Sequence, residues 1–508
     1  MTITVGGGTM KRRQFIAATG VAGLAGLSGY ANRQDGDRYL EEARKIGFEE
    51  NWGARRIDAA DDWSIEARRD VPNRQEDTTF RGTETLATAP WEPPEGWEDT
   101  IADEGDTLQI LNHGAANMEF DPATLATYEL FEEKTGIEVE PIEIGVDQAN
   151  LQEQQFLSAR QGEPHAMNVD GPLVPVFVQQ GYLEVVDPLY SEEMWDPYIS
   201  GLRQLVEWDI DATREGTHQY GYPNITEGTI GNLRPDLVEE QGIDPARFDG
   251  EWSWDLLEET MEAFEGTDVF GYAYYAGDPT YLFYSFRQLL YQQGGRLVQD
   301  DGTVSVDTEP SRTVLEKMVE WRENNWVPAD VISYGEGDIV DLFLAGRLAY
   351  VDAFSDFVPR ALSQYEAGTE YRAVEPQMAN TGPDPTQASL IDPNATAINP
   401  FADDAHKVAA LLYGDCRLSY PSQWWEFTFE GNQSYMDRVY EDAEAADFVE
   451  FSDVLGRAID RGVIELFPQQ QAIFQRLTDP FQSAIAGDTS VDEAIQQGQE
   501  IIDSGLGQ

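Results

Sequence analysis

Hydrophobic and polar positions follow two alternating periods from about residue 107 onward. Thr107 to Leu111 reads as a short apolar strand. The segment after it carries Leu125, Tyr128 and Phe131 at three-residue spacing, which predicts a helix. Alternation then resumes from Ile137 to Ile144 and predicts a second strand. A strand, helix and strand of this length predict a parallel pair of strands joined by a right-handed crossover.

A second unit of the same kind follows, with a helix from Leu151 to Arg160 and a strand from Ala166 to Val169. Polar residues come directly after the strand Thr107 to Leu111, at Asn112 to Gly114, and directly after the strand Ala166 to Val169, at Asp170 to Pro172. Ligands of open parallel sheets bind at the carboxyl ends of the strands. We therefore expect an α/β protein whose ligand site includes this common rim.

The first thirty residues have the pattern of an export signal. Lys11, Arg12 and Arg13 precede an apolar run from Ala17 to Leu27, which is too short to span a membrane. The paired arginines resemble a twin-arginine signal, which directs folded proteins out of the cell. We therefore predict a signal peptide over residues 1–31 and an extracellular protein at the cell surface.

The end of this apolar run resembles a lipoprotein cleavage site in which one residue differs. Leu27-Ser28-Gly29 is followed by Tyr30, where a lipoprotein has its acylated cysteine. A tyrosine cannot form the thioether, so we expect no lipid at this site. Cleavage after Ala31 is an alternative way to release the mature chain.

Residues 32–104 form a polar N-terminal extension. Tyr39 to Phe48 could make one amphipathic helix, whereas the proline-containing segment from Trp91 to Trp97 fits neither a helix nor a central strand. The extension also contains Trp52 and Trp63, and tryptophans favour packing over free disorder. We interpret it as a partly ordered stalk or as a segment wrapped over the main body.

Charge narrows the classes of partner. The chain has 94 acidic and 33 basic residues, for a net charge of −61. Binding to nucleic acid needs a net basic face, so we exclude that function. Self-repulsion on this scale destabilises a compact protein at low salt and is screened in concentrated salt. The composition therefore indicates a salt-loving organism.

Motifs for metal binding or catalysis are missing from the sequence. The single cysteine, Cys416, excludes an internal disulfide and a cysteine-based metal cluster. The four histidines are widely spaced, and no serine-hydrolase, zinc-protease or phosphate-loop motif occurs. We expect no cofactor and no enzymatic activity. A secreted hydrolase with paired carboxylates stays as the rival class, and a surface adhesion protein would need repeats that the chain lacks.

Several short segments, in order from about Leu108 to Ile501, resemble one protein family. Together they resemble the ABC-transporter extracellular solute-binding proteins of the maltose- and oligosaccharide-binding kind, here of a haloarchaeal type. The segments are Tyr128 to Val139, Gln180 to Leu183, Tyr220 to Pro223, Trp252 to Leu257, Gly294-Gly295 with Asp301-Gly302, Phe343 to Ala349, and Ala486-Gly487 with Ser490 to Ala494. Ser253 in this pattern is expected to cap a helix.

The resemblance implies an α/β fold of two lobes, joined by hinge strands, with the ligand in a cleft between them. Lobe I would comprise residues 105–225 and 398–453, and lobe II residues 226–397 and 454–508. It implies a monomer that captures a sugar or oligosaccharide and delivers it to ABC permease subunits with their ATPase. A polyamine or another polar organic solute is the alternative ligand.

The resemblance also places candidate ligand-binding residues. Aromatic side chains suit the apolar faces of a sugar, and carboxylates and amides suit its hydroxyls. Glu227 matches a position at the first lobe crossing, and Trp424 could supply an aromatic face in place of the stacking tryptophan of many relatives. The candidates are Asn112, His113, Asp170, Glu227, Tyr275, Asp278, Tyr284, Phe354, Asp356 and Trp424.

Overall fold

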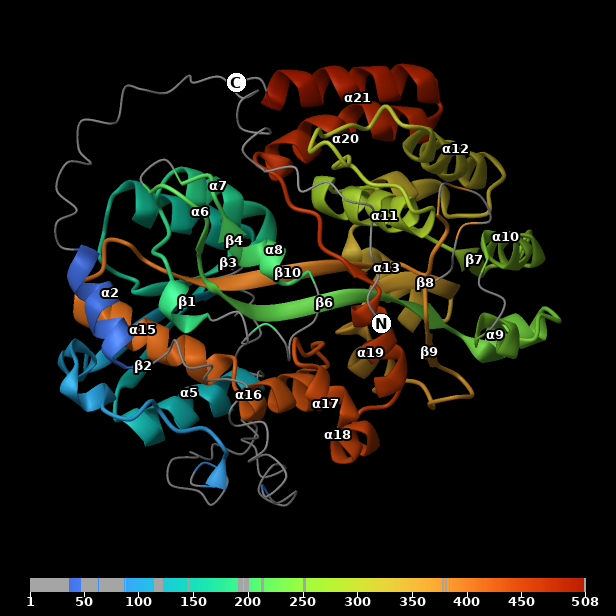
Figure 1. Cartoon of the computed structure of the whole chain (residues 1–508). Helices are drawn as coiled ribbons and strands as arrows, with labels where there is room; N and C mark the ends of the chain where they lie inside the picture. Colours follow the sequence, from blue (N-terminus) through green and yellow to red (C-terminus); the bar gives the residue numbers. More distant parts are fainter. Residues whose placement is uncertain are drawn as a thin grey trace.

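The computed structural model shows two α/β halves joined by long strands (Figure 1). It describes residues 36–46, 63, 86, 88–113, 122–144, 146–190, 195, 201–211, 214–249, 253–376, 379, 382 and 384–506. The expected signal peptide, with Tyr30, lies outside the described residues. Among the described helices, none has the length and apolar character needed to cross a membrane.

One mixed sheet runs through both halves. Its strands follow the order β2-β1-β3-β10-β6-β8-β7. Strand β1 pairs in parallel with both β2 and β3, which confirms the predicted parallel units. The strand bounds are β1 Thr107–His113, β2 Glu138–Ile144, β3 Ala166–Asp170, β6 Tyr222–Leu233, β7 Phe270–Tyr272, β8 Leu348–Phe354 and β10 Ser389–Ile398.

Strands β6 and β10 cross from one half to the other and pair with each other in antiparallel fashion (Figure 1). On one side β10 pairs with β3, and on the other side β6 pairs with β8. Two short strands extend the sheet, β9 (Arg372–Val374) beside β6 and β11 (Gly462–Val463) beside β10. We call the half with β1 to β3 lobe I and the half with β7 and β8 lobe II.

Helices cover the sheet in each lobe. In lobe I the predicted first helix is confirmed as α5, and the second covers most of the predicted range as α6. The lobe I helices used below are α5 Pro122–Thr135, α6 Val146–Ser158, α15 Asp404–Arg417 and α16 Tyr420–Trp425.

Lobe II contains a second hydrophobic core built mainly from helices. The Ser253 hydroxyl accepts a hydrogen bond from the Leu256 amide and starts α10, as predicted. The lobe II helices include α10 Trp254–Ala263, α11 Pro279–Gln292, α12 Glu309–Glu323, α13 Glu336–Leu344, α14 Phe357–Leu362, α20 Gln470–Ala486 and α21 Val491–Leu506.

The described parts of the N-terminal extension pack on lobe I. Helix α2 (Gly36–Lys45) lies against α15, and the Tyr39 hydroxyl donates to the Val185 carbonyl at 3.0 Å. The Trp91 indole donates to Asp415 at 2.8 Å, and Trp63 packs edge-on against neighbouring rings of α16. Of the two interpretations of the extension, these contacts favour the wrapped segment. Trp52 lies outside the described residues.

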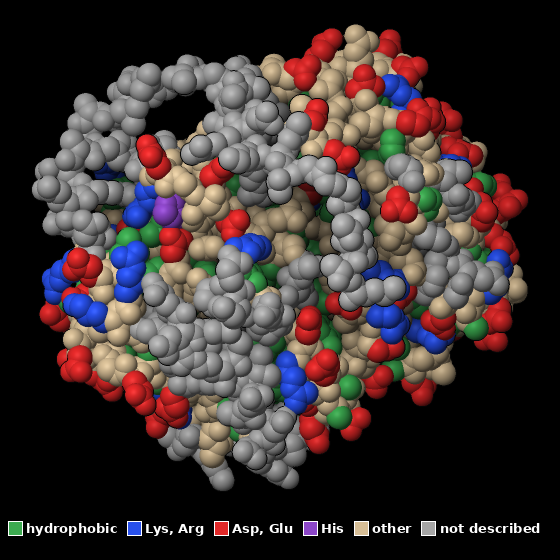
Figure 2. Space-filling view, in the orientation of Figure 1, with side chains coloured by type: hydrophobic (Ala, Val, Ile, Leu, Met, Phe, Trp, Pro, Cys, Tyr) green, Lys and Arg blue, Asp and Glu red, His purple; other side chains and the backbone are tan. Residues whose placement is uncertain are grey.

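Acidic side chains are spread over the visible surface of both halves rather than gathered in one patch (Figure 2). This distribution follows from the sequence, in which the 94 acidic residues are not grouped into one block. Buried carboxylates are therefore a feature separate from the acidic charge on the surface.

Candidate functional site

Four polar residues form a row across the strands that join the lobes. Asp392 and Asn394 alternate with buried residues along β10, and both are partly exposed. Asp392 lies directly opposite Glu227 of β6, and Asn394 lies directly opposite Asp170 of β3. Residues opposite each other in a ladder, and residues two apart on one strand, share a face of the sheet. The polar row Asp170, Asn394, Asp392 and Glu227 therefore lines one face.

Aromatic side chains continue this face into lobe II. Thr229 follows Glu227 by two positions on β6 and pairs with Phe354 of β8. The Phe354 ring meets the Tyr284 ring edge-on, with centroids 5.1 Å apart. The Tyr284 hydroxyl in turn donates to Asp392 at 2.6 Å. Helix α11, which carries Tyr284, is thereby held over the polar row.

Two further tyrosines line the start of α11. Tyr281 lies one turn before Tyr284 and donates to Glu336, the first residue of α13, at 2.8 Å. The buried Tyr275 packs against Tyr281 with ring centroids 5.7 Å apart. Together these rings offer apolar faces next to hydroxyl groups, which is the combination that a polyhydroxylated solute requires.

Lobe II adds an ion pair near the polar row. Asp356 lies at the start of α14 and forms an ion pair with Arg360 at 2.6 Å. The guanidinium of Arg360 is half exposed, whereas the Asp356 carboxyl is mostly buried. The negative charges of Asp356 and Asp392 both act on Glu227, so the carboxyls of three elements converge.

Burial and like charges raise the pKa of these acids. Burial is the main cause that raises the pKa of Asp392 and of Asp356 to about 6 each. The pKa of Glu227 is raised well above its ordinary range, first by burial and then by the charges of Asp356 and Asp392. Burial and the neighbouring charges therefore favour the protonated form of Glu227.

The residues that the sequence predicted at the lobe I rim do not all lie in the polar row. Asp170 belongs to the polar row. Asn112 is buried and accepts a hydrogen bond from Asn168, which itself accepts one from Thr396. These contacts join β1, β3 and β10, so Asn112 has a structural task. The backbone of His113 ends β1, and its side chain lies outside the described residues.

Two other predicted residues have structural tasks as well. Asp278 is exposed and caps α11 by accepting a hydrogen bond from the Thr280 amide at 2.8 Å. Trp424 is fully buried and packs edge-on against Trp63, with ring centroids 6.2 Å apart. The structure thus does not bring Trp424 to the group, because the N-terminal extension covers it. The aromatic side chains that lie next to the polar row are instead those of Tyr284 and Phe354.

Three polar residues in or near the polar row were not among the candidates predicted from the sequence: Asp392, Asn394 and Glu336. A local signal existed for the first two, because they alternate with apolar residues between Leu390 and Ala397. Nothing local singles out Glu336, which joins the group through its tertiary contact with Tyr281.

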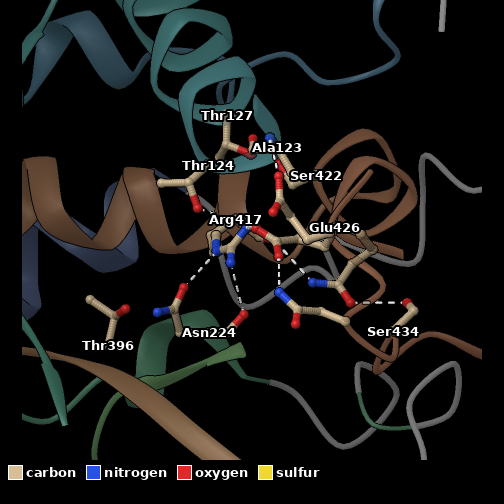
Figure 3. Close-up of polar contacts among 12 residues, drawn as sticks. Ala123, Thr124, Thr127, Asn224, Thr396, Arg417, Ser422, Glu426 and Ser434 are labelled. Carbon is tan, nitrogen blue, oxygen red and sulfur yellow. Dashed lines mark hydrogen bonds and ion pairs between the residues drawn. The ribbon is translucent and has the colours of Figure 1, made fainter. Parts of the chain in front are cut away.

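A buried polar network fixes β6 to lobe I just before Glu227 (Figure 3). Arg417 of α15 donates to the side-chain oxygen of Asn224 at 2.7 Å and to its carbonyl at 2.9 Å. The same guanidinium forms an ion pair with Glu426, which also accepts from Asn432 at 2.8 Å. The pair is nearly inaccessible to water. It therefore sets the point at which β6 leaves lobe I.

The group offers no evident metal centre. Over the described ranges, no set of three or more His, Cys, Asp or Glu side chains is arranged to hold a metal ion. Its chemistry is that of hydrogen-bond acceptors, tyrosine hydroxyls and aromatic faces.

Comparisons with known proteins agree with this arrangement. Residues 115–411, more than half of the chain, match the family model described as bacterial extracellular solute-binding protein. No curated protein matches the chain in sequence.

Solved structures resemble the fold at low sequence identity. A maltose-bound MalE3 of T. maritima is 18% identical, with a TM-score of 0.65 over 79% of this chain and 98% of its own. A solute-binding protein of Thermotoga lettingae with bound α-D-tagatose is 21% identical, with a TM-score of 0.66 over 79% and 100%. One from Agrobacterium radiobacter in complex with ribitol is 15% identical, with a TM-score of 0.64 over 79% and 98%.

Proposed function

Because the chain belongs to the bacterial extracellular solute-binding proteins, which deliver solutes to ABC importers, we propose that it captures a sugar or polyol on the polar row between its lobes. The observation that carries this proposal is the shared face of Asp170, Asn394, Asp392 and Glu227 on β3, β10 and β6. Carboxylates and an amide there accept hydrogen bonds from hydroxyls. Tyr284 and Phe354 supply the aromatic surface.

The choice of solute is supported by the similar folds that hold maltose, α-D-tagatose and ribitol. These ligands share closely spaced hydroxyls on a carbon skeleton. A row of acceptors flanked by aromatic rings suits that pattern, since acceptors bind the hydroxyls and rings cover the C–H faces.

Capture is proposed to proceed by closure of the lobes about β6 and β10. Asp170 lies on lobe I, Asp356 and Glu336 on lobe II, and Glu227 and Asp392 on the strands between them. A solute that contacts all three parts stabilises the closed form, because only that form makes every contact. No bond in the solute needs to break, so we infer a binding protein and not an enzyme.

We propose that the protein delivers its solute, on the outer side of the membrane, to ABC permease subunits that work with an ATPase. The twin-arginine pattern at Arg12-Arg13 supports export of the folded chain. Tyr30 at the lipid position supports attachment through the partner or release, not through a lipid. We propose that the protein is a monomer and meets the permease in its closed form.

A thermal-shift and calorimetry panel in about 2 M NaCl tests the proposal, because a ligand of the native state raises its apparent stability by mass action. The panel contains maltose, tagatose, ribitol, mannitol and glucose at millimolar concentration. We expect at least one class to raise Tm by several degrees and to titrate with one site. A panel without any shift would contradict the capture of a sugar or polyol by this group.

A further inference from the structure

Helix α6 of lobe I carries a carboxyl that the proposed function does not use. The side chain of Glu153 is fully buried. Neither of its oxygens has a hydrogen-bond partner in the part of the chain that the structure describes. A buried carboxylate without a partner is costly. Such a group therefore needs a reason beyond the packing of α6.

The position of Glu153 points to the polar row. Helix α6 packs on β1 and β3, and Asp170 ends β3. Asp170 lies near enough for its negative charge to act on Glu153, and it also acts on Asp392 and Tyr284. Glu153 therefore lies near the lobe I end of the polar row, on the side of Asp170.

Two cations, Arg360 and Arg287, act on Glu227 and Asp392 of this row. Arg360 is held by Asp356 at 2.6 Å. Arg287, whose charge also acts on Asp392, donates to Tyr291 at 2.9 Å and to the Glu465 carbonyl at 3.2 Å. Adaptation to salt does not explain these acids, because that effect concerns carboxylates on the solvated surface.

We propose that the captured solute carries a protonated amine, which binds between Glu153, Asp170, Asp392 and Glu227. This inference rests on the proposed function and names the class of solute more closely. An ammonium group has three donors and no acceptor. It can therefore satisfy carboxyls that come from three separate elements while it neutralises their charge. The rings of Tyr281 and Tyr284 next to the row add faces that attract a cation.

An organic ammonium fits the site better than a bare metal ion. The described acids are not arranged as a metal-ligand set. They are spread along a row that spans both lobes, and aromatic rings flank it on the α11 side. An elongated solute with a cationic group and an apolar skeleton matches this shape and its chemistry. Amino sugars and polyamines share that ammonium chemistry.

Matched pairs of ligands test the inference. Calorimetry in about 2 M NaCl at pH 7.5 compares glucose with glucosamine and mannitol with 1-amino-1-deoxymannitol, and adds spermidine and putrescine. We expect the amine of at least one pair, or a polyamine, to bind tenfold or more tightly than the neutral sugars. Preference among the amines tells an amino sugar from a polyamine.

The outcomes separate this inference from the proposed function. If neutral members bind as tightly as the amines or more tightly, the amine requirement is overturned and capture of a sugar or polyol stands. If an amino sugar binds best, both stand. If a polyamine binds and no sugar or polyol does, the amine inference stands and capture of a sugar or polyol is overturned. If nothing in the panel binds, both fail.

A conservative variant tests the residue itself. Glu153→Gln keeps the size of the side chain and removes its charge. We expect amine affinity to fall about tenfold, affinity for a neutral sugar to change little, and Tm without ligand to stay equal or rise. Glu133→Gln, at an exposed position of α5 in the same lobe, is the control. If Glu153→Gln leaves the ratio of amine to neutral affinity unchanged, Glu153 is only structural and the inference fails for this residue.

Discussion

Glu227 and Asp392 lie directly opposite each other on β6 and β10, the two strands that join the lobes. Like charges directly opposite each other in a ladder destabilise a sheet. We therefore expect a bound solute to offset the repulsion between these two carboxyls. Both carboxyls also lie on the strands about which we propose that the lobes close.

Replacement of Glu227 should weaken solute binding while the free protein stays folded. A hydrogen bond to a charged acceptor contributes about 1.5–3 kcal/mol, so Glu227→Ala should lower affinity about tenfold to a hundredfold. Tm without ligand should be unchanged or higher, because the substitution removes a desolvated charge. Calorimetry and melts of the same preparation measure the two effects.

Glu227→Gln separates the two kinds of solute. A neutral sugar should keep much of its affinity, because the amide still accepts a hydrogen bond, whereas an amine should lose most of its affinity. Full retention of binding in Glu227→Ala would place Glu227 outside the ligand site.

Stability should depend on pH through Asp392 in a defined direction. Its pKa in the folded protein is raised from 3.8 to about 6, so between these values the folded state binds more protons than the unfolded state. The stabilising contribution is complete below about pH 4 and is lost as pH rises through about 6. The loss amounts to at most about 3 kcal/mol.

Asp392→Asn removes this pH-dependent loss and should raise Tm relative to the parent at pH 7.5, with no gain near pH 4. Melts at several pH values in constant molar salt measure the difference. The groups that face Asp392 are Tyr284, Asp170, Arg287, Glu336 and Glu227. A difference in Tm that stays constant over this pH range would show that Asp392 keeps its ordinary pKa.

Dilution of salt should unfold the protein. In about 1 M NaCl the Debye length is roughly 3 Å, and in ~0.1 M it is about 10 Å. A net charge of −61 then repels itself over the whole surface. Circular dichroism should show a lower Tm on dilution, and the same dilution of KCl is the control for ion identity. Melts that do not respond to dilution would refute salt adaptation.

Trp63 should stabilise lobe I through the rings that it covers. Its ring lies 5.6 Å from that of Trp425 and 6.2 Å from that of Trp424. Trp63→Ala should lower the free energy of unfolding by about 3–5 kcal/mol without weakening solute binding. Denaturant titration measures this loss, and Leu151→Ala at an exposed position is the control. A loss as small as the control's would mean that the extension is a loosely attached stalk.

The buried pair Arg417 and Glu426 should be sensitive to loss of one partner. Arg417→Met leaves the Glu426 carboxyl buried without its cation, which should cost about 3–5 kcal/mol of unfolding free energy. The double variant Arg417→Met with Glu426→Leu should lose less, because no unpaired charge remains. The partly exposed pair of Arg247 and Glu259 is the control, and Arg247→Met should cost less than about 1 kcal/mol. Equal losses in the two single variants would argue against a buried anchor for β6.

The sequence by itself determined the elements and the family. The three-residue spacing of Leu125, Tyr128 and Phe131 predicted α5, and the alternation beside it predicted β1 and β2, because these periods follow from the geometry of one helix or strand. The ordered segments pointed to the solute-binding family that the family model confirms. Asp170 could be named because it follows a predicted strand, and Glu227 because the resemblance places it at a lobe crossing; the structure places both in the polar row.

Only the tertiary structure decided which residues meet. Tyr284 and Asp392 are 108 positions apart and share a hydrogen bond because α11 lies over β10. From the sequence alone, Trp424 could be either a buried or a ligand-facing residue, and the structure shows that it is buried against Trp63. Glu153 reads as an ordinary polar residue on a helix, and its unpartnered burial next to Asp170 depends on how α6 packs on β3. The physical reason is common to all three: a local pattern sets how a segment folds, whereas burial and contact depend on segments that are remote in the sequence.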